Sequence, residues 1–365
     1  MNTTPGLVCA HHHLYSALAR GMPAPPSSPT GFAEILEQVW WRLDCALDLD
    51  ILHWSAKLGA LEALESGTTC IIDHHEGPNA IDGSLDVIAA ACAEVGVRVN
   101  TTYGVTDRHG VAQAFGGPSA RIPINRQPSA SGERPSQMTD GARRGLAECE
   151  RFIRSGGRGM VGLHAAFTCS DETLEAAAGL AVDLGVGVHV HVAEGAGDAD
   201  AGSRLDHLCT DDWLTVHCVH LDRVLKGTIA HNPRSNMNNA VGYADPARRP
   251  NRVVLGTDGI GADMLDEFRV AYVRHRESDV TATPDTAWSW LTNSWQLFPE
   301  ALADEVTWTY PVMEPWHLAF SPGVRPTKVV IDGRTVLDDG VVRSVDAAEV
   351  RAKAAEAARR LFTLL

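Results

Sequence analysis

Short runs of apolar, mostly β-branched residues recur along the chain, and most of them end in a cluster of polar side chains. Runs of this length and composition are typical of buried strands. We expect eight strands, at residues 6–13, 68–75, 97–104, 160–167, 186–194, 213–220, 227–233 and 252–259.

Segments with apolar residues at helical spacing lie between most of these runs. The clearest cover residues 32–47, 49–64, 85–95, 142–153 and 174–184. Ser170 stands before two acidic residues ahead of the last segment, which is a typical helix start. Strands that alternate with helices predict an α/β fold whose parallel sheet closes into a (β/α)8 TIM-like barrel. An open doubly wound sheet is the alternative, but no GxGxxG motif follows the first strand.

The remaining segments depart from this alternation. We expect the barrel to occupy residues 6–300, a small β domain residues 301–346, and a C-terminal helix residues 347–365. Two Asp-Gly turns between short apolar runs support the small β domain. Residues 107–137 are rich in Gly, Pro, Arg and Ser, which predicts either a lid or a disordered insertion.

Composition narrows the classes of protein that fit. The chain of 365 residues carries a formal charge of −15, which disfavours nucleic acids and anionic membranes as partners. It contains no long apolar run, and its first residues do not resemble a signal peptide. Its eight cysteines are scattered and form no CxxC pair. We therefore expect a reduced, cytoplasmic protein without a disulfide framework.

Histidines at the ends of the predicted strands indicate a metal site. His11 and His13 share one face of the first strand, because residues two apart in a strand do so, and His12 should point away. The pattern repeats in the fifth strand, where His191 should reach the barrel mouth and His189 should lie one layer deeper. An HxH pair at a strand end is a common way to give a metal two imidazoles.

Polar residues at later strand ends complete the pattern. Glu194 follows the fifth strand, His217 and His220 end the sixth, and Asp258 ends the eighth. Three imidazoles and a carboxylate could close on one divalent ion and leave a place for water. Buried structural histidines could explain one or two of these positions, but they do not easily explain the whole series in this order.

On these motifs the chain resembles the amidohydrolase superfamily. The resemblance is to its metal-dependent aminohydrolase branch, which holds cytosine, guanine and adenosine-type deaminases and triazine hydrolases, and within it to the SsnA-type aminohydrolases. Matching stretches include "PGLVCAHHHLYSALARGM", "GTTCIIDHHEGPNAIDGSLD", "HVHVAEG", "HNPRSNMNNAVG" and "LGTDGIGADM". Relatives place half of a β-sandwich before the first barrel strand. The resemblance therefore implies a TIM-like barrel with only a partial β-sandwich, formed by the C-terminal region.

The resemblance assigns a role to each matching position. The implied metal ligands are His11, His13, His191 and Asp258. The implied catalytic groups are Glu194 as proton shuttle, His217 as the group that orients and polarises water, and Asp258 as acceptor of the water proton. The expected substrate contacts are His164, His75, Trp41 and Asn232. The last three have plain alternatives, which are a surface turn, a core tryptophan and a helix cap.

The implied function is that of a metal-dependent aminohydrolase. Metal-bound hydroxide would attack an amino-bearing sp² carbon of a small nitrogen heterocycle and release ammonia. The ion would be Zn²⁺, with Fe²⁺ and Mn²⁺ as alternatives. Hydrolysis of a cyclic amide or a carbon–halogen bond by the same site is a second possibility. A shortened homologue that only binds metal, and a homodimer, also remain open.

One connection is shorter than the fold requires. Only ten residues separate His220 from His231, and they include the seventh strand. A parallel crossover usually needs a dozen or more residues with its helix. We expect poor cover over strands six and seven, and we expect His217 to be the least well positioned catalytic group.

Overall fold

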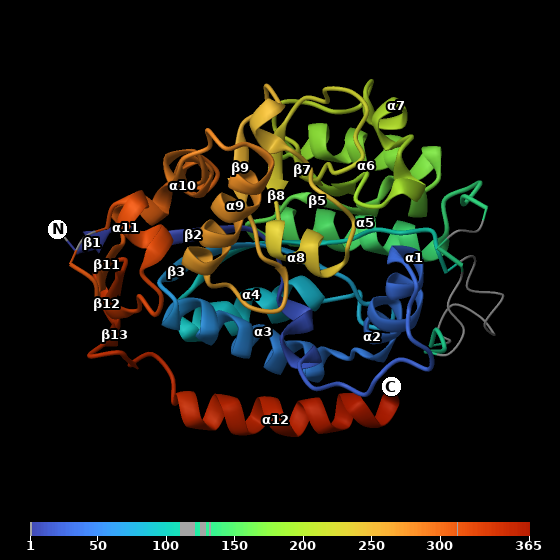
Figure 1. Ribbon diagram of the computed structural model, residues 1–365. Helices are drawn as coiled ribbons and strands as arrows, with labels where there is room; N and C mark the ends of the chain where they lie inside the picture. Colours follow the sequence, from blue (N-terminus) through green and yellow to red (C-terminus); the bar gives the residue numbers. More distant parts are fainter. Residues whose placement is uncertain (1, 110–120, 125–128, 131–132, 312) are drawn as a thin grey trace.

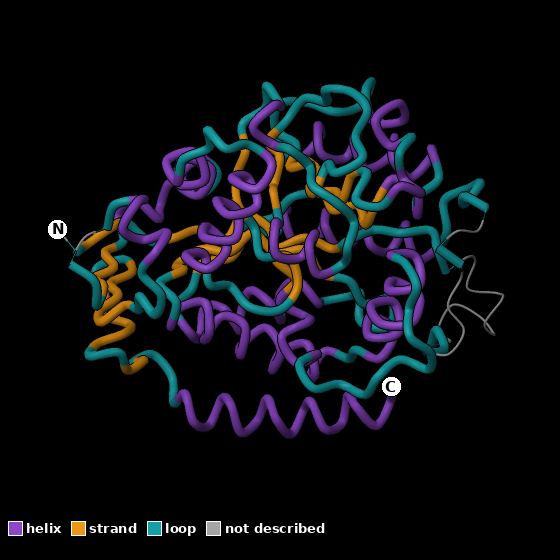
Figure 2. Tube along the Cα trace, in the orientation of Figure 1, coloured by secondary structure: helices purple, strands orange, loops and turns teal. Residues whose placement is uncertain are grey.

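The computed structural model describes residues 2–109, 121–124, 129–130, 133–311 and 313–365. Parallel strands occupy its centre with helices around them, and a small antiparallel sheet stands beside this body, near the N-terminus (Figures 1 and 2). Much of the stretch 107–137, for which a lid or an insertion is predicted, lies outside the described residues.

The central strands form a closed barrel. Its strands are β2 (Leu7–His13), β3 (Thr68–His75), β4 (Arg98–Tyr103), β5 (Val161–Ala165), β6 (Val188–Val192), β7 (Leu214–His217), β8 (Thr228–His231), and β9 (Val253–Leu255) continued by β10 (Asp258–Gly259). Neighbouring strands are parallel, and β10 pairs with β2. Two isolated parallel bridges, Thr101 with Gly159 and Val105 with Leu163, join the segments that contain β4 and β5. The chain therefore has the TIM-barrel type of fold that the alternation of strands and helices predicts.

Helices surround the barrel. They are α1 (Phe32–Ile35), α2 (Trp41–Ala46), α3 (Leu49–Glu65), α4 (Ser84–Val95), α5 (Asp140–Arg154), α6 (Asp171–Leu184), α7 (Ala201–Leu205), α8 (Pro233–Asn238), α9 (Met264–Ser278) and α10 (Pro284–Asn293). Three short ones, α1, α2 and α8, lie at its mouth. Ser170 caps α6 as expected, because its side chain accepts a hydrogen bond from the N–H of Thr173. The continuous helix expected over 32–47 is instead divided by a π-helical turn, η2 (Leu36–Trp40). Such turns recur at functional sites.

The short connection between β7 and β8 contains no helix within residues 218–227, all of which the structure describes. The strands it joins are nevertheless buried, and Leu221 and Leu225 of the connection belong to the same hydrophobic cluster as Ile229 of β8. Arg249 donates hydrogen bonds to the carbonyls of residues 218, 221 and 223, and Asn251 donates to those of residues 225 and 227. The expectation of poor cover is therefore wrong, since two side chains from the next loop fasten the connection.

The small sheet is antiparallel, with the strand order β1-β11-β12-β13-β14. Its strands are β1 (Thr3–Thr4), β11 (Glu305–Trp308), β12 (Pro326–Ile331), β13 (Arg334–Asp338) and β14 (Val341–Val342), and α11 (Pro315–Phe320) lies between the second and third. N-terminal residues thus complete a sheet that was expected from the C-terminal region alone. The described residues form a single antiparallel sheet here, which does not confirm the expected partial β-sandwich.

The last helix, α12 (Ala347–Leu364), runs along the outside of the barrel against α3 (Figure 1). Its buried residues are Val350, Ala354, Ala357 and Leu361, which recur at the spacing of one helix face. None of the described helices combines the length and the apolar content needed to cross a bilayer.

Candidate metal centre and active site

Four buried side chains from three strands meet at the C-terminal end of the barrel. They are His11, His13, His191 and Asp258, and their donor atoms all lie within 4.8 Å of one another. Asp258 Oδ1 lies 3.1 Å from His11 Nε2 and 2.9 Å from His13 Nε2, and the Nε2 atoms of His13 and His191 are 3.2 Å apart. We call these four residues the quartet. Three imidazoles and a carboxylate are a donor set that fits a divalent transition metal.

The outer nitrogen of each quartet histidine is occupied. His13 Nδ1 lies 2.6 Å from the carbonyl oxygen of His74, and His191 Nδ1 lies 2.5 Å from a carbonyl oxygen of β5. His11 Nδ1 lies 2.8 Å from Nε2 of His189, one layer deeper in the barrel. Metal-binding histidines usually use one nitrogen in this way, which fixes the ring and leaves the other for the ion. All three Nε2 atoms are therefore directed at the centre of the quartet.

His12 faces away from the quartet, as strand geometry predicts, but it is not a surface residue. Its side chain is fully buried, and Nδ1 lies 2.7 Å from the carbonyl oxygen of Asp258 and 2.9 Å from Thr257 Oγ1. His12 therefore holds the eighth strand against the first, behind the metal centre.

Glu194 and His217 stand beside the quartet. Glu194 Oε2 lies 3.4 Å from His217 Nε2, which in turn lies 3.9 Å from Asp258 Oδ2. His217 Nδ1 is 2.7 Å from Asn236 Oδ1, and its backbone is left-handed with φ of 67°. Asn236 of α8 thus contacts the ring of His217 although no helix precedes β8, and whether His217 is the least well positioned catalytic group stays a prediction. Asn239 also donates to Glu194 Oε1, at 3.4 Å.

The two carboxyl groups of this site differ in acidity. Burial, with the nearby charge of Asp258 acting in the same direction, raises the pKa of Glu194 to about 7. Burial would also raise the pKa of Asp258, but hydrogen bonds from His11 and His13 outweigh it and hold that pKa well below its usual range. Asp258 is thus ionised before the reaction begins, whereas Glu194 can take and return a proton near neutral pH.

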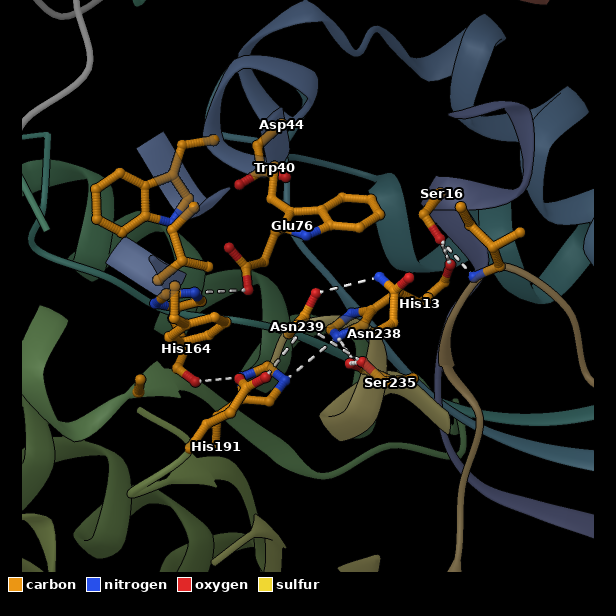
Figure 3. Close-up of a pocket in the computed structure, with 18 of the residues that line it drawn as sticks. His13, Ser16, Trp40, Asp44, Glu76, His164, His191, Ser235, Asn238 and Asn239 are labelled. Carbon is orange, nitrogen blue, oxygen red and sulfur yellow. Dashed lines mark hydrogen bonds and ion pairs between the residues drawn. The ribbon is translucent and has the colours of Figure 1, made fainter. Parts of the chain in front are cut away.

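A cavity of about 210 Å³ opens above the quartet. Its walls carry the aromatic side chains of Tyr15, Phe32, Trp40, Trp41 and Phe167 and the carboxyl groups of Asp44, Glu76, Glu194, Asp198 and Asp258. In Figure 3, Asp44, Glu76 and Trp40 group on one side of the cavity, and His191 and Ser235 lie across from them. The predicted substrate contacts His164 and Trp41 are among the lining residues.

The other two predicted substrate contacts do not reach this cavity. His75 is fully buried between Tyr15 and Tyr103, and its Nε2 lies 3.4 Å from the carbonyl oxygen of Ala80. Asn232 is also fully buried, and its amide lies 3.4 Å from Nδ1 of His217. Neither side chain lines the cavity among the described residues, so their placement favours a structural role.

An ion-paired group lies at the wall opposite the quartet, and no sequence motif pointed to two of its members, Asp44 and Arg108. Arg108 donates to Asp44 Oδ2 at 2.5 Å and to Glu76 Oε2 at 2.9 Å, and all three side chains are buried. Burial, followed by the charge of Glu76, raises the pKa of Asp44 to about 8. His164 Nε2 lies 3.3 Å from the second oxygen of Glu76 (Figure 3). The sequence could have indicated Asp44, because acidic side chains are rarely buried and this one lies on the buried side of a predicted helix.

Solved structures with similar folds include two zinc-containing enzymes. An adenosine deaminase from Xanthomonas campestris with bound zinc superimposes with a TM-score of 0.75 at 22% identity, over 99% of this chain and 86% of that one. An atrazine chlorohydrolase from Arthrobacter aurescens TC1, complexed with zinc, superimposes with a TM-score of 0.70 at 20% identity, over 98% and 88% of the two chains. At these identities the likeness establishes the fold alone.

Sequence relatives lie closer. A 5′-deoxyadenosine deaminase from Methanopyrus kandleri is 32% identical over 76% of this chain, and the match spans 63% of that enzyme's length. The enzyme of the same name from Methanococcus vannielii is 26% identical over 97% of this chain and 87% of its own. The profile of the Amidohydrolase family matches residues 2–293. With this match and the quartet at its expected strand ends, the chain belongs to the amidohydrolase family.

Proposed function

We propose that the protein is a metal-dependent aminohydrolase, which replaces the amino group on an sp² carbon of a small nitrogen heterocycle by oxygen and releases ammonia. The observation that carries this proposal is the juxtaposition of the quartet with Glu194 and His217, where His13, His191, Glu194 and Asp258 line one cavity. Relatives named as deaminases of a nucleoside support it.

The quartet, His11, His13, His191 and Asp258, would hold one divalent ion, and we propose Zn²⁺ because the donors are mainly imidazoles. When bound, such an ion lowers the pKa of water toward neutrality. Asp258 has one carboxyl oxygen among the ligand atoms, while Ser235 Oγ lies 2.5 Å from the other. This second oxygen can hold the proton that leaves the water.

Glu194 would transfer protons during the reaction, and His217 would orient the water. The water oxygen forms a bond to the ring carbon, and the bond from that carbon to the amino nitrogen breaks. One water proton ends on the adjacent ring nitrogen and the other leaves in ammonia, so atoms and charges balance. Glu194, with its pKa raised to about 7, suits both transfers. His217 Nε2, 3.4 Å from Glu194 Oε2, can orient the water on the same side.

His164 is the best placed of the proposed ring contacts. Its side chain lines the cavity, and Thr168 Oγ1 and Glu76 Oε1 lie within reach of its two nitrogens, at 2.7 and 3.3 Å. Trp41 offers little surface, since it is 1% exposed and Arg108 stacks on its ring at 4.9 Å. Trp40, its half-buried neighbour in the same wall, presents more of its ring.

An ammonia-release screen tests the proposal. Protein loaded with one zinc ion per chain would be incubated with amino-substituted purines, pyrimidines and triazines, and ammonia would be measured with the hydroxylated product. We expect one ammonia per product molecule in at least one ring series, and about 10²-fold slower release with Glu194→Gln. Ring opening or halide release without ammonia would instead establish one of the other hydrolytic reactions. No reaction in any series from the zinc-loaded protein would refute the proposal.

A further inference from the structure

The short helix α8 and the residue that follows it contact all three proposed catalytic groups, Asp258, His217 and Glu194. The contacts are Ser235 Oγ to Asp258 Oδ2 at 2.5 Å, Asn236 Oδ1 to His217 Nδ1 at 2.7 Å, and Asn239 Nδ2 to Glu194 Oε1 at 3.4 Å. We call Ser235, Asn236 and Asn239 the trio. One element of the fold therefore contacts three side chains that come from three different barrel strands or their ends.

Helical spacing brings the trio together. Asn239 follows Ser235 by four residues, so the two side chains lie on one face of the helix, and Asn239 Nδ2 is 3.4 Å from Ser235 Oγ. Both line the cavity above the quartet (Figure 3). Each member of the trio is at most 8% exposed, whereas Met237 is 52% exposed. The trio therefore belongs to the buried side of α8.

The position of α8 is itself fixed by α9. Glu267 of α9 is 1% exposed, and its carboxyl oxygens accept hydrogen bonds from the backbone N–H of Arg234 at 2.9 Å and from its side-chain Nε at 3.3 Å. The backbone N–H groups at the start of a helix have no partner within the helix, so this carboxylate supplies one. A helix of six residues has little stability of its own, and the contact with Glu267 therefore helps to set where the trio lies.

The contact with Asn236 turns the ring of His217 toward the other two catalytic groups. An amide oxygen only accepts hydrogen bonds, so the Nδ1–H of His217 donates to Asn236 Oδ1. The other ring nitrogen, Nε2, lies 3.4 Å from Glu194 Oε2 and 3.9 Å from Asp258 Oδ2. It has no hydrogen-bond partner among the described residues. The three catalytic groups therefore converge at Nε2 of His217.

The other two members of the trio can orient carboxyl groups but cannot pass a proton between them. Ser235 donates its one hydroxyl proton to Asp258 Oδ2. The amide nitrogen of Asn239 only donates, and it does so toward Ser235 Oγ and Glu194 Oε1. These two side chains therefore form no proton route from Asp258 to Glu194, and a proton must cross the space that the catalytic groups face.

We propose that the trio are positioning residues for the three catalytic groups. Each member holds one group so that all three face the same space, and no member is needed to retain the metal or to set the affinity for substrate. This inference rests on the proposed aminohydrolase function. A displacement of about 1 Å in a reacting group can cost about 10²-fold in rate, so loss of any member should lower kcat.

Double-mutant cycles test whether each member acts through its partner. We expect Asn239→Ala to lower kcat about tenfold, as for the loss of one hydrogen bond, with KM nearly unchanged and one zinc retained per chain. In a Glu194→Gln background the same replacement should cost almost nothing, because the carboxyl group that it positions is gone. The second cycle pairs Asn236→Ala with His217→Gln. Effects that multiply in either cycle, or a loss that lies in KM, would overturn the inference.

Ser235 and Met237 provide matched variants on the same helix. Ser235→Ala should lower kcat about tenfold, whereas Ser235→Thr keeps the hydroxyl group and should retain most of kcat. Met237→Ala is the control, because this exposed side chain does not line the cavity within the described structure, and it should change neither kcat nor KM. Ser235→Thr as slow as Ser235→Ala, in folded protein with full zinc content, would contradict the role of the hydroxyl group.

A spectroscopic measurement separates this inference from the proposed function. If no ring series releases ammonia, the proposed reaction fails, but the hydrogen bond of His217 can still be observed by proton NMR of zinc-loaded protein with isotope-labelled histidine. We expect a downfield, slowly exchanging N–H resonance that His217→Gln removes. Asn236→Ala should shift it upfield or broaden it, and Met237→Ala should leave it in place. An unchanged resonance in Asn236→Ala would refute the positioning of His217 by α8.

Discussion

Asp258 sits in a strained loop that Arg234 holds in place. Asp258 and Ile260 both have left-handed backbones, with φ of 61° and 60°, which is unfavourable for residues other than glycine. The guanidinium of Arg234 lies 2.8 Å from the carbonyl oxygen of Thr257 and 3.0 Å from that of Ile260, and Glu267 holds Arg234 from behind. Arg234 is therefore a positioning residue for the carboxylate of the quartet.

Replacement of Arg234 should weaken metal binding although no ligand is removed. We expect Arg234→Ala to lower zinc affinity about 10- to 100-fold, the usual effect of losing a group that orients a ligand. Arg234→Lys should restore little, because a single ammonium cannot span the carbonyls that the planar guanidinium reaches. Competition with a chromogenic chelator measures the affinity. Unchanged affinity in Arg234→Ala would show that the loop holds its shape unaided.

The Glu194→Gln variant should lose proton transfer while it keeps metal binding. Glu194 lies beside the quartet but is not one of its four members. We expect the variant to keep one zinc per chain and to lose about 10²-fold or more in kcat, because an amide cannot shuttle protons. Elemental analysis and steady-state kinetics on the same sample decide. A variant with normal kcat would remove Glu194 from the proposed mechanism.

The sequence brought the four proposed metal ligands together more successfully than it identified the residues of the cavity wall. The alternation of side chains along a strand places His11 and His13 together, and the structure has them so. It also holds at the end of β3: in the "DHHE" stretch His74 and Glu76 lie on the side of His191 and Glu76 reaches the cavity, whereas His75 points away, so alternation contradicts the choice of His75. Asp44 lies on a helix outside the barrel strands, and no strand pattern could place it beside Arg108.

Among the elements, the connection from β7 to β8 is held by side chains instead of a helix. Asn251 donates two hydrogen bonds into it, both at 2.9 Å, to the carbonyls of Leu225 and Gly227. Each bond contributes about 0.5–1.5 kcal/mol. The connection leads into β8, which precedes α8, and α8 carries the partner of His217. The connection is therefore coupled to the position of His217, for which we propose a catalytic role.

Loss of the Asn251 side chain should loosen this connection selectively. We expect Asn251→Ala to raise hydrogen exchange over residues 218–227 about tenfold, while β6 keeps its protection. Arg248→Ala is the control, since that side chain is 85% exposed and its one ion pair in the described structure is with Asp245 three residues away. Equal exchange in both variants would mean that Asn251 does not fasten the connection.

The elements themselves were largely predictable from apolar periodicity. All eight barrel strands fall within their expected ranges, and β3 matches residue for residue. The π-helical turn at Leu36–Trp40 could not be predicted, because its residues continue the apolar spacing of the helices on either side. The sequence did not predict how the connection from β7 to β8 is held, because this depends on Arg249 and Asn251, which follow the connection by more than twenty residues.

For the whole molecule, Arg98 joins the barrel to the region of the small sheet. On β4, its guanidinium binds both oxygens of Asp304, at 2.7 and 2.9 Å, and also reaches Asp332 at 2.5 Å. Asp304 precedes β11 and is 3% exposed. Bidentate pairing of a buried carboxylate with an arginine is costly to break, because the remaining charge has no partner.

Removal of Arg98 should destabilise the molecule while sparing the metal centre. We expect Arg98→Ala to lower the free energy of unfolding by about 3–5 kcal/mol. The double variant Arg98→Ala/Asp304→Ala should recover part of this loss, because it also removes the stranded charge. Urea unfolding gives the energies and elemental analysis the zinc content. A double variant less stable than Arg98→Ala would contradict this account of the pair.

The number of predicted strands indicated that the barrel closes. The sequence did not show which strands make up the small sheet. Thr3 and Thr4 form β1, and two residues are too few for a strand pattern to be recognised. Their place is set instead by pairing with Val306 and Thr307, more than three hundred residues away. Contacts between residues so far apart in the sequence form only in the folded chain, so β1 could not be predicted from the sequence.

Metal content across single variants tests the central claim most directly. The claim is that His11, His13, His191 and Asp258 hold one divalent ion, with His12 and His189 behind them. Each protein would be loaded with zinc, dialysed and measured by elemental mass spectrometry, with folding checked by circular dichroism. The account predicts about one zinc per chain in the unaltered protein and in His12→Thr, and well below one in His11→Ala, His13→Ala, His191→Ala and Asp258→Ala. One zinc per chain in all folded quartet variants, or equal loss in His12→Thr and the quartet variants, would contradict it.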